Sequence, residues 1–132
     1  MKKIILCLCI AALSLMYGCQ KNDENEKTNS ATTYAFTDNT GNDGFFSEYS
    51  ILLCEYDNAG SKVHTEKLDN PVKGQRYAFT ANNHAEKLKV KIQAKYGTTS
   101  FIKWIQQVFY LEIGGNVDVT LEGSTIVGSN EP

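Results

Sequence analysis

The residues whose types could do chemistry are few and lie far apart in the sequence. His64 and Glu66 stand two positions apart in a run that predicts a strand, so their side chains point the same way and could begin a metal site. Structural zinc takes four ligands, and nothing nearby completes such a set. We therefore interpret both as polar residues of an exposed edge strand, and we place His84 in a turn at residues 82–85.

The remaining nucleophile and acids do not favour catalysis. Cys54 ends an apolar run at residues 50–54, and no neighbouring histidine or cation would lower the pKa of its thiol, so we interpret it as a small buried side chain. Glu55 and Asp57 lie near a predicted strand end without an identifiable partner. The chain has no P-loop, dinucleotide-binding glycine motif, Gly-x-Ser-x-Gly or His-Glu-x-x-His. These observations predict a non-enzyme that needs no cofactor.

Residues 38–44 form an oxygen-rich, glycine-rich loop with some likeness to a calcium loop. Counted from Asn39, the third position is Gly41 and the twelfth is Ser50, so the third ligand and the bidentate glutamate are both missing. We interpret the loop as a polar turn and predict no metal site.

Two groups of residues are candidates for binding a ligand. The first is a stripe of lysines, which could hold an anionic glycan or lipid head group but is also typical of a solvated strand face; it comprises Lys87, Lys89, Lys91 and Lys95. We favour the solvated face, because the charge of the whole domain does not reinforce the stripe. The second is Phe45 and Phe46, directly after the glycine-rich loop, either as a plug in the core or as an exposed contact.

The N-terminus is typical of an export sequence. Lys2 and Lys3 precede an apolar run at residues 4–16, which is too short to span a bilayer. The run ends in Gly18 and Cys19, which resemble the site where lipoprotein signal peptidase cuts and leaves a lipidated cysteine. An ordinary secretory signal is the alternative. Removal of residues 1–18 lowers the formal charge from −2 to −4 and leaves Cys54 as the only cysteine besides Cys19, so the exported domain folds without a disulfide.

Residues 19–31 predict a lipidated cysteine followed by a flexible tether, since residues 20–30 include no aliphatic or aromatic side chain. Residues 20–24 resemble the acidic export sequence of surface lipoproteins of Bacteroidota. The resemblance implies an outer-membrane lipoprotein on the outer face of the cell. If residues 20–24 are not an export sequence, the lipoprotein faces the periplasm.

The folded part, residues 32–132, reads as short strands between turns. Residues 32–36, 49–56, 62–68 and 76–81 predict four of them, the second buried on both faces and the third at an edge. The clearest is Lys87–Tyr96, where apolar and polar residues alternate over ten positions before a hairpin turn at Gly97.

The segment at residues 101–111 has the spacing of both a helix and a strand. We interpret it as a strand, with Trp104 in the sandwich core and a bulge at Gln106 and Gln107, because β-branched and aromatic residues dominate it. A hairpin is expected at residues 113–116, followed by a strand at 116–122 and a short one at 124–127. About seven strands in about 100 residues predict a single antiparallel β-sandwich.

Residues 73–81 and 88–92 look like the middle of immunoglobulin-like and transthyretin-like sandwiches. Together with residues 104–111, they are similar to small surface lipoproteins of Bacteroidota. The resemblance implies a fold and a location but no chemistry. Because the chain is mildly acidic, we predict no nucleic-acid partner. The expected function is a monomeric, lipid-anchored binding module for a protein or a glycan; the alternatives are a structural subunit of an envelope assembly and, last, a small hydrolase.

Overall fold

The structure is a computed structural model that describes residues 30–132. The predicted signal peptide (1–18), Cys19 and positions 20–29 of the predicted tether lie outside the described residues. The described part is all-β, as the sequence predicted, and holds no helix. Its nine strands are β1 (Thr33–Asp38), β2 (Glu48–Tyr56), β3 (Lys62–Asp69), β4 (Arg76–Thr80), β5 (Lys87–Tyr96), β6 (Thr99–Ile105), β7 (Phe109–Tyr110), β8 (Asn116–Leu121) and β9 (Val127–Gly128).

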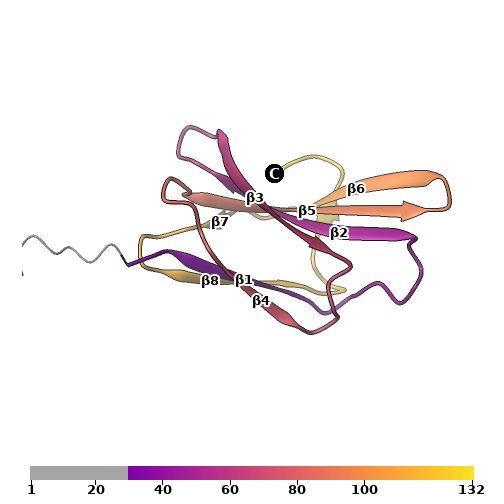
Figure 1. The fold of residues 1–132 in the computed structure, drawn as a ribbon. Helices are drawn as coiled ribbons and strands as arrows, with labels where there is room; N and C mark the ends of the chain where they lie inside the picture. Colours follow the sequence, from indigo (N-terminus) through magenta and orange to yellow (C-terminus); the bar gives the residue numbers. More distant parts are fainter. Residues whose placement is uncertain (1–29) are drawn as a thin grey trace, which may run out of the picture.

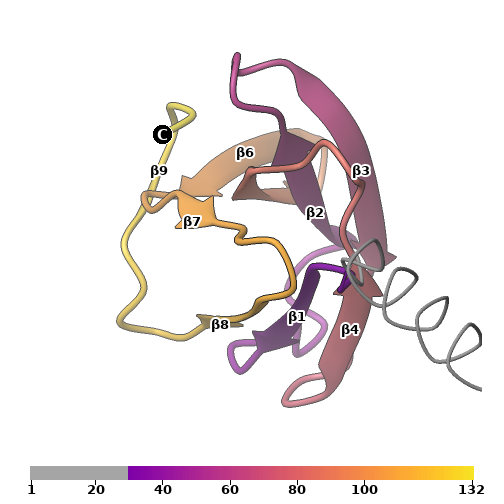
Figure 2. The same ribbon diagram turned by 90° about the vertical axis from the view of Figure 1, so that its left-hand side faces the viewer.

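The strands form two sheets, an arrangement consistent with a β-sandwich (Figures 1 and 2). The small sheet has three strands in the order β4-β1-β8. The large sheet has six, in the order β3-β2-β5-β6-β9, with β7 also paired to β5. The expected edge position of β3 is confirmed.

The prediction of a purely antiparallel sandwich is wrong at one place. Strand β8 pairs with β1 in parallel, and the hairpin expected at residues 113–116 does not form, because β7 pairs with β5 in the other sheet. The turn itself exists: Gly114 has a φ of 73°, and the Gly115 amide donates to Glu112 O over 2.8 Å. Turn residues fix a change of direction, whereas the pairing partner depends on distant strands, so this turn carries the chain from the large sheet to the small one.

Strand β5 has the predicted bounds and is the centre of the large sheet. Leu88 and Val90 are fully buried, Ile92 and Ala94 are partly buried, and Tyr96 is exposed. Burial decreases along the strand because β5 has ten residues, whereas β1 and β4 of the facing sheet have six and five. The large sheet therefore overhangs the small one where the β5–β6 hairpin projects (Figure 1).

Residues 101–111 form two strands on the same side of β5. Trp104 pairs with Lys91, and Phe109 pairs with Leu88. Between these two pairs the chain advances five residues from Trp104 to Phe109, but β5 spans only three from Lys91 to Leu88. Two extra residues therefore loop out between β6 and β7. The sequence predicts one strand with a bulge at Gln106 and Gln107; the interruption lies there, but it divides the segment into two strands.

The core lies between the two sheets and includes Tyr34, Phe36, Tyr49, Ile51, Leu53, Leu88, Val90, Ile105, Leu111, Val119 and Leu121. Two tyrosine–carboxylate hydrogen bonds cross it. At one end the Tyr34 hydroxyl donates to Glu55 Oε1 over 2.6 Å, and at the other the Tyr49 hydroxyl donates to Asp38 Oδ2 over 2.7 Å. Each bond joins β1 to β2, so each fastens one sheet to the other.

Trp104 is buried, with 7% of its surface exposed, but not in the sandwich core as predicted. It belongs to a second cluster with Cys54 and Tyr56. The neighbouring Ile105 packs in the core, and since successive side chains of a strand alternate, Trp104 points to the outer face of the large sheet. Alternation shows that Trp104 and Ile105 lie on opposite faces of the strand. Both faces are covered here, so the alternation alone does not identify the face that meets the core.

Candidate functional site

An apolar patch covers the overhanging end of the large sheet. This distal patch consists of Phe45, Phe46, Ile92, Ala94, Tyr96, Phe101 and Val127, and it lines a hollow of about 380 Å³ whose one charged neighbour is Lys103. The Phe45 ring stacks on Tyr96, with 5.0 Å between ring centroids, and meets Phe46 edge to face at 4.9 Å. Phe45 is 65% exposed and Phe101 is 41% exposed. Contiguous exposed apolar surface of this kind is typical of a contact site.

The loop before β2 decides which of the two phenylalanines is exposed. The Asn42 side chain accepts a hydrogen bond from the Phe46 amide over 2.9 Å and donates one to the Phe46 carbonyl over 3.0 Å. These bonds hold Phe46 against the core, where its ring stacks on Tyr49. Phe45 is left pointing outward, so of the two alternatives for this pair, Phe46 is the plug and Phe45 is the exposed contact.

An open strand edge adjoins the distal patch. Strand β9 pairs only with Trp104 and Ile105, and within residues 30–132 no strand pairs with this side of β6 at Thr99–Lys103. Phe101 and Ile102 lie on opposite faces of this open edge, and both are exposed. An edge with free backbone groups and apolar side chains on both faces is a template for another strand.

The distal patch lies at the end of the domain away from Ser30, where the described part of the chain begins. Ser30 packs so close to Gly114 that a Cβ on that glycine would lie 2.9 Å from the serine Cβ, and Thr33 N donates to Gly115 O. The chain thus enters beside the loop between β7 and β8, whereas the β5–β6 hairpin, which follows the end of β5 at Tyr96, lies at the opposite end (Figure 1).

The lysine stripe shares one strand face, as the alternation predicts, but its members have separate partners. Lys87 reaches Asn58 O at 3.5 Å, Lys89 pairs with Glu131 at 3.0 Å and Lys95 pairs with Glu48 at 3.0 Å. The Lys91 ammonium lies 5.6 Å from the centre of the Trp104 ring. Two of the four charges are thus paired with a carboxylate, and the other two contact a carbonyl oxygen and an aromatic ring.

The other candidates occupy ordinary structural positions. Burial raises the pKa of the Cys54 thiol. Burial also acts to raise the pKa of Asp38, but hydrogen bonds from Thr40, Gly41 and Tyr49 outweigh it and hold that pKa below its usual value. The carboxylate closes the loop at residues 38–44 as a polar turn.

His64 and Glu66 form an exposed pair, with 2.9 Å between Nε2 and Oε1. In the part of the chain that the structure describes, no three histidine, cysteine or acidic side chains come together as a metal site would require.

A second hollow, which the sequence did not predict, opens at the end of the domain where Ser30 lies beside Gly114. It has a volume of about 980 Å³ and is lined by three loops that carry Asp57, Glu86, Glu112 and the exposed ring of Tyr110. Each loop looks like an ordinary turn in the sequence, and only the fold brings the three together.

Comparisons of the chain with protein-family models, curated proteins and solved structures found no match. Among residues 30–132 there is also no helix with the length and apolar character that a membrane span needs.

Proposed function

We propose that this chain is a non-enzymatic, lipid-anchored module of the cell envelope that binds a protein through the distal patch and the open edge of β6. The observation that supports the proposal is the position of the patch, exposed and apolar, beside unpaired backbone at the end away from the tether. With Cys19 in the outer membrane, that end is the one farther from the point where the tether joins the domain. A monomeric two-sheet domain of the immunoglobulin-like or transthyretin-like kind, as in surface lipoproteins of Bacteroidota, fits this role.

The chemistry of the patch favours a protein over a glycan. Its lining is apolar except for Lys103, so it has few groups to satisfy sugar hydroxyls. A strand of a partner would pair with the backbone at Thr99–Lys103 and place alternate side chains against Phe101 and Tyr96. If that pairing is permanent, the chain is a structural subunit of an assembly.

A glycan is the second candidate, and the second hollow favours it. There the exposed Tyr110 ring offers a stacking face, while Asp57, Glu86 and Glu112 offer acceptors for hydroxyl groups.

Photo-crosslinking on intact cells tests the distal patch. A crosslinking amino acid at Phe45, and separately at Ile102, is expected to give the same protein adduct, while one at the equally exposed Tyr110 gives none. Phe101→Arg should abolish both adducts, because it places a charge in the apolar hollow. It should leave folding intact, because that ring is 41% exposed.

An adduct from Tyr110 alone, or none from the two patch positions, would contradict the protein-binding proposal. Binding of the purified protein to a glycan array, lost on Tyr110→Ala and kept in Phe101→Arg, would support the glycan instead.

The anchor is tested by Cys19→Ser. We expect this change to move the protein from the detergent phase to the aqueous phase, because the acyl chains supply the membrane affinity at about 0.8 kcal/mol per buried methylene. Phase partitioning followed by immunoblotting measures the effect, and Cys54→Ser is the matched control. Unchanged partitioning of Cys19→Ser would exclude lipidation at this residue.

A further inference from the structure

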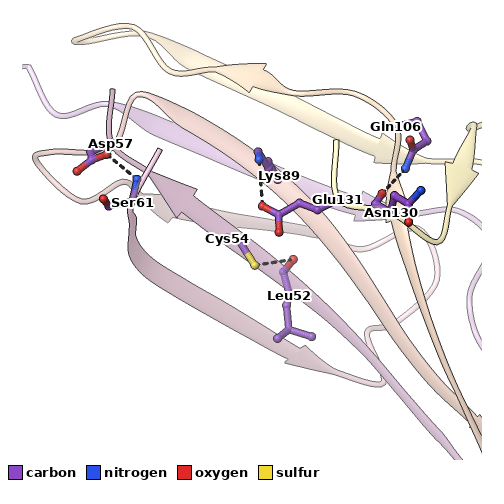
Figure 3. Close-up of polar contacts among 8 residues, drawn as sticks. All are labelled: Leu52, Cys54, Asp57, Ser61, Lys89, Gln106, Asn130 and Glu131. Carbon is purple, nitrogen blue, oxygen red and sulfur yellow. Dashed lines mark hydrogen bonds and ion pairs between the residues drawn. The ribbon is translucent and has the colours of Figure 1, made fainter. Parts of the chain in front are cut away.

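Residues 127–131 cross the outer face of the large sheet as a strap (Figure 3). Val127 and Gly128 pair with Ile105 and Trp104 as β9. Beyond them the contacts are made by side chains: Lys103 Nζ donates to Ser129 Oγ over 3.1 Å, and Gln106 Nε2 donates to Asn130 O over 2.8 Å. The strap ends with Glu131, whose carboxylate is 3.0 Å from Lys89 Nζ.

Glu131 sits in a pocket built for a carboxylate. The Lys89 ammonium is partly buried, with 18% of its side chain exposed, and lies 4.6 Å from the centre of the Tyr56 ring. Burial and the interaction with Glu131 raise the pKa of the Tyr56 hydroxyl, while Tyr56 and Lys89 lower the pKa of Glu131. An ammonium and a phenol aimed at one point form a charge-assisted pair of donors.

The strap is held by a short strand and by polar side-chain contacts rather than by the core. Its strand has two residues, Ile126 and Val127 are exposed, and none of its side chains is buried in the core between the sheets. The same side of β6 continues from Trp104 to Thr99 without a partner. A strand that paired along the whole of β6 would need the place that β9 occupies.

We propose that the outer face of the large sheet carries a binding site for an extended acidic segment of a partner protein, which residues 127–131 occupy in the free protein. The ligand has the pattern of the strap: a β-branched residue opposite Ile105 and, four positions later, an Asp or Glu at Lys89 and Tyr56. This inference deepens the proposed function, because it rests on strand pairing with β6, and it adds the chemistry of the partner.

Trp104 reports on the strap because it is the only tryptophan of the chain, its backbone pairs with Gly128, and its side chain clusters with Tyr56 of the Glu131 pocket. In the full chain purified in detergent, Glu131→Gln is expected to shift the Trp104 emission to longer wavelength and to increase its quenching by acrylamide. Glu48→Gln is the matched control, since it removes another lysine–glutamate pair of 3.0 Å and should leave the emission unchanged.

The ligand chemistry is tested with a peptide of residues 125–132 and its counterpart with Gln in place of Glu131. In the Glu131→Gln protein, the glutamate peptide should restore the buried emission and bind about tenfold tighter than the glutamine peptide. Lys89→Gln, added to this background, should abolish the difference.

Two results would overturn the proposal: an unchanged Trp104 signal in Glu131→Gln, or equal affinity for both peptides. Circular dichroism checks that each variant is folded. The crosslinks from Phe45 do not involve Glu131, so failure of the strap and failure of the distal patch are distinguishable.

Discussion

Replacing Glu55 with alanine is expected to lower the free energy of unfolding by about 3–5 kcal/mol, since each hydrogen bond to a charged group contributes roughly 1.5–3 kcal/mol. Glu55 is fully buried, and its two oxygens accept from the Tyr34 hydroxyl over 2.6 Å and from the Asn82 amide over 2.7 Å. Alanine would leave the Tyr34 hydroxyl buried without a partner and would also remove the acceptor of the part-buried Asn82 amide. Domains of this size are stable by only about 5–15 kcal/mol, so the loss is a large share of the total.

The matched control is Glu55→Gln. An amide supplies an oxygen for the Asn82 N–H and an NH₂ group to which the Tyr34 hydroxyl can turn as acceptor, so we expect a loss of about 1 kcal/mol. Chemical denaturation followed by circular dichroism measures both variants. A loss below about 1 kcal/mol for Glu55→Ala, the size typical of surface positions, would show that the carboxylate does not fasten the sheets.

The elements that the sequence predicts best are those whose pattern is local. The alternation in Lys87–Tyr96 fixes both the strand and its two faces, because a period of two has one geometric meaning, and Gly97 closes the hairpin that follows. The partner of β8 was not predictable in this way. Its apolar residues fit a hairpin and a parallel pair equally well, and the choice depends on the distant β1.

The candidate site likewise combines residues that a local pattern predicts with residues that only the fold brings together. Phe45 and Phe46 stood out beside their glycine-rich loop, but Tyr96 and Phe101 looked like ordinary strand residues. They become a site only because the large sheet overhangs the small one, which depends on the relative lengths of strands in different sheets. The lysine stripe is visible in the sequence, whereas the pairing of Lys89 with Glu131 is a contact across 42 residues.

Trp104 is the residue for which the predicted burial was correct and the predicted location was wrong. Its ring packs with Cys54 and Tyr56 on the outer face, beneath Lys91 and beside β9. We expect Trp104→Ala to lower the free energy of unfolding by about 3 kcal/mol, at the low end of the usual 3–5 kcal/mol for this change. The low end applies because the strap has few contacts and could collapse into the space that the ring leaves.

Chemical denaturation followed by circular dichroism measures the loss, because the variant has no tryptophan to report by fluorescence. Trp104→Phe keeps an aromatic face for the Lys91 ammonium and should lose about 1 kcal/mol, as a partial truncation does. Tyr110→Ala, at a ring that is mostly exposed, should change the free energy of unfolding by less than about 0.5 kcal/mol. If Trp104→Ala behaved like Tyr110→Ala, the ring would contribute no more than an exposed one, and the second cluster would not be part of the stable fold. A loss near the expected value would show instead that the large sheet is stabilised on both of its faces, by the core on one and by Trp104 and its neighbours on the other.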